Sequence, residues 1–368
     1  LDISHGGFMM RSSGRGIVLP LAFIIGVTAV VGGTMYVTSA TDVFGDEDSS
    51  ESSIDKIPSG VQLVASVDIN SLMEEERVNE LIETGQGKLS KYDSDYDIPE
   101  DYQSIVKRIK EKIGLSLEEL ESVTLFGKFP KDSDEFLAGG YGAALVQSQW
   151  EEEEIVDALE NITVNLTKKT YKEFTVYKLS CEDCLSSDLE IDRNPTLAIL
   201  SDGFYAIGSV EAVHDVIDTV KGDRESFDGD LRSDFEQLGD GQIRLAIEIP
   251  SREISEMESI EGIGLKGLAK VELSAGVLSI DGSDISIKAR LRTSDTDSAK
   301  EIHDSLNGVM GLAKAMIGSQ DFKEELGKVS IDRDGVVVIV DYETSIEEFS
   351  SMIQDLQSFS KPSISIEP

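Results

Sequence analysis

Two distant segments of the chain follow one pattern, and this repetition constrains the fold more than any other feature of the sequence. Residues 201–217 read SDGFYAIGSVEAVHDVI, and residues 333–353 read RDGVVVIVDYETSIEEFSSMI. Each contains Asp-Gly, which favours a tight hairpin turn because Gly tolerates positive φ. An apolar strand pattern follows, and Ser209 or Ser345 then suits the N-cap of a helix. Because every feature has a structural explanation, we interpret the pair as one structural unit copied, not as a catalytic element used twice.

Two further pairs of segments repeat in the same order. VQLVASVDINS at 61–71 resembles QIRLAIEIPS at 242–251, and both alternate in the manner of half-buried strands. GAALVQSQWEEEEIVDALENI at 142–162 corresponds to KARLRTSDTDSAKEIHDSLNGV at 288–309. Three pairs in one order indicate an internal duplication of strands and helices.

These repeats predict an α+β fold in which two duplicated modules, each with antiparallel sheets backed by helices, follow one another. We place module 1 at residues 57–238 and module 2 at residues 239–361, with a C-terminal tail at 362–368. The spacing between copies shrinks along the chain. Module 1 is therefore expected to carry extra residues, at 85–121 and at 161–195.

A stretch without charged residues, at 16–41, predicts an N-terminal transmembrane helix. At about 1.5 Å of rise per residue, such a helix crosses a hydrocarbon core of about 30 Å. Basic residues precede it and acidic residues follow it, so the positive-inside rule places residues 1–15 in the cytoplasm and the rest outside. Residues 42–56 are acidic and rich in Ser, which predicts a flexible stalk between the membrane and the folded region.

Two other interpretations of the apolar stretch stay open. Thr38, Ser39 and Ala40 suit the cleavage site of a signal peptide, although an apolar region of about 7 to 15 residues is usual in such peptides. GRGIVLP at 14–20 is similar to the processing site before the apolar helix of an archaeal pilin, but the large soluble region behind it is unlike a typical pilin. The length of the stretch favours an uncleaved anchor.

The charge balance excludes one class of partner. Acidic residues number 71 and basic residues 33, which gives a formal net charge of -38. Nucleic-acid binding depends on neutralising phosphates with Lys and Arg, so we expect no nucleic-acid partner. The excess of carboxylates keeps a protein soluble, and a saline habitat would screen its self-repulsion. The composition indicates moderate adaptation to salt.

Cys181 and Cys184 are the two cysteines of the chain. Outside the cell they are expected to form a short-loop disulfide. A redox or metal role is the alternative. It is less favoured because a redox CxxC normally opens a helix after a strand, whereas this pair lies in the polar run SCEDCLSSD at 180–188.

Two further motifs suggest modification or metal binding. Asn161 and Asn165 each begin an N-glycosylation sequon, meaningful in an exported chain, although so short a motif also arises by chance. The carboxylates in KYDSDYDIPEDY resemble the first half of a calcium loop, but the Gly and the closing Glu of that loop are missing. A solvated acidic loop is the simpler reading of this segment, whose candidate calcium ligands are Asp93, Asp95, Asp97 and Asp101.

An uncharged N-terminal stretch, an acidic stalk and a segment such as ILSDGFYAIGSVEAVHDVID at 199–218 occur together in this chain. In this arrangement the chain resembles uncharacterised membrane-anchored surface proteins of halophilic and related euryarchaea. The resemblance implies an envelope location in an archaeon and brings no known activity with it.

The sequence therefore predicts a single-pass, membrane-anchored extracytoplasmic protein of the cell envelope. Its role would be non-enzymatic, in binding other envelope proteins or in surface architecture, with no cofactor except the candidate calcium. One alternative is an extracytoplasmic ligand-binding or sensor protein with a pocket between the modules. The other is a metal-assisted hydrolase that uses the carboxylates of residues 93–101.

Overall fold

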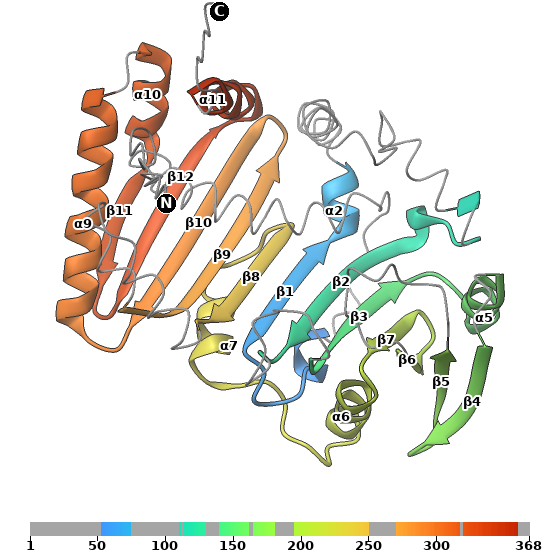
Figure 1. Cartoon of the computed structure of the whole chain (residues 1–368). Helices are drawn as coiled ribbons and strands as arrows, with labels where there is room; N and C mark the ends of the chain where they lie inside the picture. Colours follow the sequence, from blue (N-terminus) through green and yellow to red (C-terminus); the bar gives the residue numbers. More distant parts are fainter. Residues whose placement is uncertain are drawn as a thin grey trace, which may run out of the picture.

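The described residues of the computed structural model form one antiparallel sheet of 12 strands (Figure 1). The structure describes residues 53–74, 110–111, 114–129, 140–161, 165–180, 195–249, 270–316 and 319–359. The strands in chain order are β1 (Leu63–Asp68), β2 (Leu120–Gly127), β3 (Gly142–Ser148), β4 (Asn165–Tyr171), β5 (Phe174–Ser180), β6 (Thr196–Ser201), β7 (Phe204–Gly208), β8 (Ile243–Glu248), β9 (Val271–Asp281), β10 (Asp284–Thr293), β11 (Ser330–Asp334) and β12 (Val337–Ser345).

The predicted division into two modules with separate sheets is wrong. The strand order is β11-β12-β10-β9-β8-β1-β2-β3-β7-β6-β5-β4, so β1 and β8 pair with each other and join the two halves. We call this β1–β8 pairing the seam. The physical reason is that two separate sheets would each leave the polar backbone groups of one further edge strand without partners, whereas the seam satisfies them.

The strand order repeats on the two sides of the seam. Outward from it, β1, β2, β3, β7 and β6 follow one another on one side, and β8, β9, β10, β12 and β11 on the other. The first side adds the hairpin β5–β4 at the outer edge, from residues in which the sequence indicated extra material. The edge strands β4 and β11 carry charged side chains, which hinder pairing with another chain.

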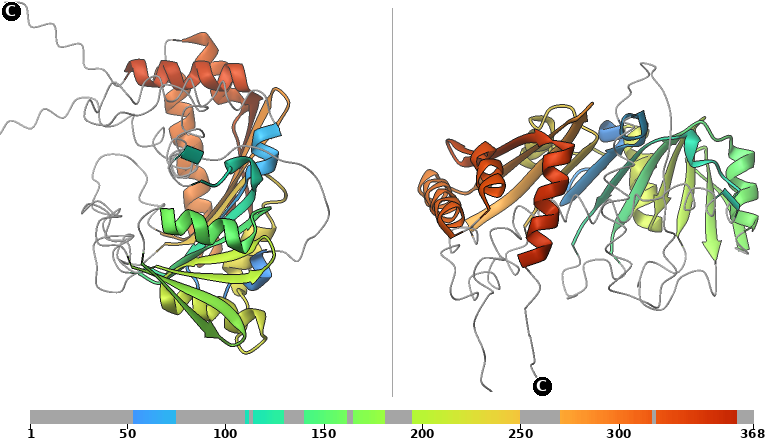
Figure 2. Two further views of the ribbon diagram at one scale, coloured as in Figure 1. Left: turned by 90° about the vertical axis from the view of Figure 1, so that its right-hand side faces the viewer. Right: turned by 90° about the horizontal axis from the view of Figure 1, so that it is seen from above.

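Helices cover both faces of the sheet. The described helical elements are η1 (Ser53–Lys56), α2 (Ile69–Glu74), η2 (Leu117–Glu119), α5 (Glu152–Asn161), α6 (Val210–Val220), α7 (Gly229–Glu236), α9 (Thr296–Met316), α10 (Gln320–Lys328) and α11 (Ile346–Phe359). Figure 2 shows the sheet twisting along its length, with α9, α10 and α11 near one end and α5 near the other.

Two hydrophobic clusters lie on opposite faces. Val277 and Leu278 are neighbours on β9, so their side chains point to opposite faces. Val277 packs in the cluster that includes residues of η1, α6 and α7, and Leu278 in the cluster that includes residues of α5, α10 and α11. The face covered by α6 and α7, which we call the α7 face, carries the site described below.

Both predicted Asp-Gly turns and both predicted helix caps are confirmed. β6 and β7 are joined through Gly203 at φ +69°, and β11 and β12 through Gly335 at φ +58°. Ser209 Oγ accepts a hydrogen bond from the N–H of Ala212 over 3.3 Å. Ser345 Oγ accepts one from the N–H of Glu348 over 3.2 Å. The opening pattern of the sequence is thus a hairpin followed by a capped helix, twice.

Helix α7 lies within the predicted module 1 in sequence. In the structure it packs on β8 and β9 of the second half. The fully buried Asp234 of α7 accepts hydrogen bonds from Arg290 Nε at 3.2 Å and from Arg292 Nε at 2.6 Å, both on β10. These ion pairs fix α7 across three strands of the second half.

The predicted transmembrane helix, at 16–41, lies outside the described residues. Within the part of the chain that the structure describes, no helix is long and apolar enough to cross a membrane. The last residues of the predicted stalk are described: Ser53–Lys56 form η1, and Ile54 is buried in the cluster of the α7 face. Residues 53–56 of the predicted stalk therefore belong to the folded region, because Ile54 packs in its core.

Candidate functional site

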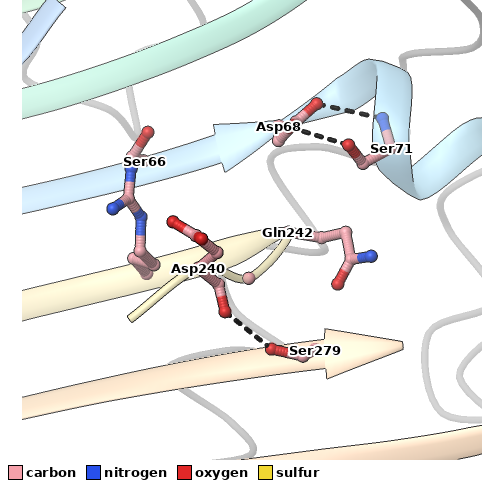
Figure 3. Close-up of a pocket in the computed structure, with 8 residues that line it drawn as sticks. Ser66, Asp68, Ser71, Asp240, Gln242 and Ser279 are labelled. Carbon is pink, nitrogen blue, oxygen red and sulfur yellow. Dashed lines mark hydrogen bonds between the residues drawn. The ribbon is translucent and has the colours of Figure 1, made fainter. Parts of the chain in front are cut away.

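A polar cavity of about 360 Å³ lies at the seam, partly open to solvent (Figure 3). It is formed where the C-terminal end of β1 runs beside the N-terminal end of β8, and β9 supplies its far side. The residues that line it are Ser66, Asp68, Ser71, Asp240, Gly241, Gln242, Arg244 and Ser279. Both halves of the chain thus contribute to one site.

The strand registers bring the polar side chains together. Ser66 of β1 pairs with Arg244 of β8, so the two side chains project from the same face of the sheet. Ile243 of β8 pairs with Leu278 of β9, and Ser279 therefore lies beside the start of β8. Arg244 also contacts Phe235 of α7, which places the cavity on the α7 face.

Asp68 is held by the first turn of α2. Its Oδ1 accepts a hydrogen bond from the N–H of Ser71 over 2.9 Å, and its Oδ2 accepts one from Ser71 Oγ over 2.8 Å. Asp68 thus occupies an N-cap position, where a carboxylate satisfies free N–H groups of a helix start. Each carboxylate oxygen retains accepting capacity, so Asp68 is fixed in place without being saturated.

Gln242 and Gly241 shape the floor of the cavity. The Gln242 amide donates to Ile280 O and accepts from Ile280 N, both at 2.8 Å, which locks the start of β8 against β9. A Cβ at Gly241 would lie 2.3 Å from Val277 Cγ2 and 2.9 Å from Leu278 O. Only Gly allows the chain to pass so close to β9 here.

Asp240 presents a carboxylate with no fixed partner among the described residues. Its main-chain carbonyl accepts a hydrogen bond from Ser279 Oγ over 3.1 Å, which anchors the residue (Figure 3). Its side chain makes no hydrogen bond or ion pair with a described residue. The residue is exposed, so its carboxylate is accessible to a ligand.

Arg244 is the most unusual group of the site. Its guanidinium lies 4.8 Å from the centroid of the Phe235 ring, a cation–π contact. Within the described part of the chain it makes no hydrogen bond and no ion pair. Burial lowers the pKa of the Arg244 guanidinium, and the nearby carboxylates of Asp240 and Asp68 oppose this effect without reaching ion-pair distance.

The Arg244 side chain can still donate hydrogen bonds to a ligand. A guanidinium offers five N–H donors in a planar fork, and partial burial without a protein acceptor costs free energy that a ligand acceptor would offset. Carboxylates and phosphates match the fork. The site therefore combines a half-buried guanidinium that can donate to a ligand with two carboxylates that can accept from it.

None of the described residues that line the cavity was predicted as a site residue from the sequence. Cys181 and Cys184, and the candidate calcium ligands Asp93, Asp95, Asp97 and Asp101, lie outside the described residues. Of the two sequon residues, Asn161 ends α5 and Asn165 begins β4, and their side chains are not described. Among the residues that are described, no group of three or more His, Cys, Asp or Glu side chains is arranged to hold a metal ion.

Sequence reasoning anticipated a pocket between the two halves as an alternative, but it did not identify the lining residues. The alternating sequences of β1 and β8 did contain an indication of these residues. On the α7 face, Val64 is followed by Ser66 and Asp68, and Ala246 is preceded by Arg244. Polar residues that continue an otherwise buried face of two strands mark the end of the core and the start of a site.

No protein-family model and no curated protein matches the chain. Among solved structures, crystal form III of TP0453 is similar with a TM-score of 0.44 and 12% sequence identity, over 82% of this chain and 97% of that chain. Crystal form I of TP0453 has a TM-score of 0.42 and 12% identity, over 84% of this chain and 99% of that one. A TM-score below 0.5 carries no inference about function.

Proposed function

We propose that the chain is a non-enzymatic, extracytoplasmic binding protein of the cell envelope that takes a small polar ligand into the cavity at the seam. The apolar segment 16–41 tethers it to the membrane, and the acidic body faces the exterior. The observation that carries the binding role is Arg244, a half-buried cation without a hydrogen-bond partner among the described residues, in a polar cavity.

The size and chemistry of the cavity support this proposal. Ligand pockets commonly measure about 300 to 1,000 Å³ and use a few placed polar groups for orientation. The cavity of about 360 Å³ lies at the small end of that range and has convergent polar groups from both halves. Arg244 is half-buried and has no hydrogen-bond partner among the described residues, so an acceptor on a ligand would offset part of its desolvation cost.

Thermal unfolding of the full-length chain in detergent, with a panel of amino acids, organic acids and sugars added singly, tests the binding role. A ligand that binds the folded state alone raises the unfolding temperature by mass action. At least one compound is expected to stabilise the wild type and not Arg244→Gln.

The matched control is Arg333→Gln. Arg333 is exposed on the edge strand β11 and donates to Thr296 O over 3.0 Å, far along the sheet order from the seam. It should respond to the panel as the wild type does. Stabilisation that persists in Arg244→Gln, or a panel without effect on the wild type, contradicts the proposed site.

Protease treatment of intact cells that produce the chain tests the location. The body after residue 56 should be degraded without lysis, while a cytoplasmic marker protein survives. Degradation of the body only after lysis contradicts an exterior location.

A further inference from the structure

We infer that the ligand is a small zwitterion of the α-amino acid class, with its carboxylate on Arg244 and its ammonium group on Asp240 and Asp68. This inference rests on the proposed function, because it specifies the ligand of the same cavity. It follows from how opposite charges are distributed around the cavity.

The cation and the carboxylates of the cavity are close enough to interact electrostatically and yet do not pair. Asp240 and Asp68 both act on the charge of Arg244, but neither forms an ion pair with it. Asp68 is held away by Ser71, and Asp240 is anchored through its main chain to Ser279. The cavity thus keeps a positive and a negative pole apart.

A ligand with one charge satisfies only one of these poles. A simple carboxylate on Arg244 would bring its negative charge near two aspartates, and a simple ammonium ion near Asp240 would leave Arg244 without an acceptor. An α-amino acid has both groups on one carbon atom and complements both poles at once. Ser279 Oγ donates its proton to the Asp240 carbonyl and can still accept a hydrogen bond from the ligand, whereas Ser66 Oγ is hydrogen-bonded to Thr124 Oγ1 over 3.1 Å.

The volume of the cavity limits the size of the ligand. About 360 Å³, partly open to solvent, accommodates a single amino acid with room for a side chain toward the opening. The guanidinium of Arg244 lies 4.8 Å from the centroid of the Phe235 ring, a contact that limits its motion before a ligand arrives.

Calorimetric titration of the full-length chain in detergent with L-alanine, propionate and ethylammonium tests the inference. Propionate lacks the ammonium group of L-alanine, and ethylammonium lacks its carboxylate. The wild type should bind L-alanine at least tenfold more tightly than either.

Two variants test the contributions of the cation and of the carboxylates of the cavity separately. Arg244→Gln should weaken L-alanine binding at least tenfold. Asp240→Asn should also weaken L-alanine binding at least tenfold, whereas it should leave propionate binding unchanged or stronger because a negative charge is removed. Arg333→Gln should bind all three compounds as the wild type does.

The outcomes distinguish failure of the zwitterion inference from failure of the proposed binding function. If propionate binds as tightly as L-alanine and its binding is lost in Arg244→Gln, the cavity binds simple anions; the zwitterion inference is then overturned and the proposed function stands. L-alanine binding that is insensitive to Arg244→Gln overturns both. If no amino acid binds while an organic acid or a sugar of the panel stabilises the wild type through Arg244, the inference alone fails.

Discussion

Ser66 and Arg244, from the two halves of the chain, are directly paired across the seam and both line the same cavity. The pairing that makes one sheet out of two repeated strand sets therefore also assembles the candidate site. Neither half contains the site by itself, since Asp68 comes from one half and Arg244 with Ser279 from the other.

Asp234 is predicted to be the most important single charge for stability among the described residues. Its side chain is 0% exposed and pairs with Arg290 and Arg292, so Asp234→Ala removes the one buried carboxylate that both guanidinium groups share. Such a loss costs about 3–5 kcal/mol. Denaturant unfolding measures it.

Asp230→Ala is the matched control, because Asp230 lies on the same helix and its carboxylate is 3.7 Å from Arg292 but 74% exposed. Surface ion pairs contribute about 0–1 kcal/mol. Equal effects of Asp234→Ala and Asp230→Ala would contradict the assignment of the buried network.

The two Asp-Gly turns are predicted to respond differently to the same substitution. A Cβ at Gly335 meets no atom within 4 Å, so Gly335→Ala carries only the strain of positive φ, about 1–2 kcal/mol. A Cβ at Gly203 would also lie 2.3 Å from Ser148 O, a backbone atom. Gly203→Ala should therefore cost clearly more than Gly335→Ala in denaturant unfolding, and the reverse order would contradict the packing of β7 beside β3.

Glu348 is predicted to make stability depend on pH in the acidic range. Hydrogen bonding to Lys328, and then to Ser345, lowers the pKa of Glu348 from 4.5 to about 2. A lowered pKa in the folded state stabilises the protein above the unfolded value and loses that effect as pH falls. The stability advantage of the wild type over Glu348→Gln should be full above pH 4.5 and disappear as pH falls to about 2.

Denaturant unfolding of the wild type and Glu348→Gln across that range measures the effect. In a Lys328→Met background the pH-dependent difference should shrink, because the largest cause of the pKa shift is removed. A difference between wild type and Glu348→Gln that does not vary with pH would show that the ion pair at the start of α11 does not form in solution.

Local features of the fold were predictable from sequence, and the global arrangement was not. The turns at Gly203 and Gly335 and the caps at Ser209 and Ser345 depend on a few adjacent residues, whose backbone preferences decide the outcome. The β1–β8 seam depends on pairing between segments far apart in the chain. An alternating pattern shows that a strand has two faces, but it does not reveal which strand lies beside it.

For the same reason, the sequence alone did not reveal the residues of the candidate site. Arg244 in the strand sequence QIRLAIE has many possible partners when the sequence alone is considered, because acidic residues are abundant. Its unpaired state follows from the hydrogen bonds that engage Asp68 and from the position of Phe235 under the guanidinium. These are properties of the assembled sheet and of α7.

The most direct test of the account is the Nε–Hε resonance of Arg244 in a spectrum of the arginine-labelled full-length chain in detergent, assigned by its loss in Arg244→Gln. Addition of L-alanine should shift this resonance, because the guanidinium gains an acceptor, while the resonance of Arg333 stays in place. An Arg244 resonance that does not move at any concentration of L-alanine, or that moves equally with ethylammonium, would contradict the claim that this arginine receives the carboxylate of a small ligand.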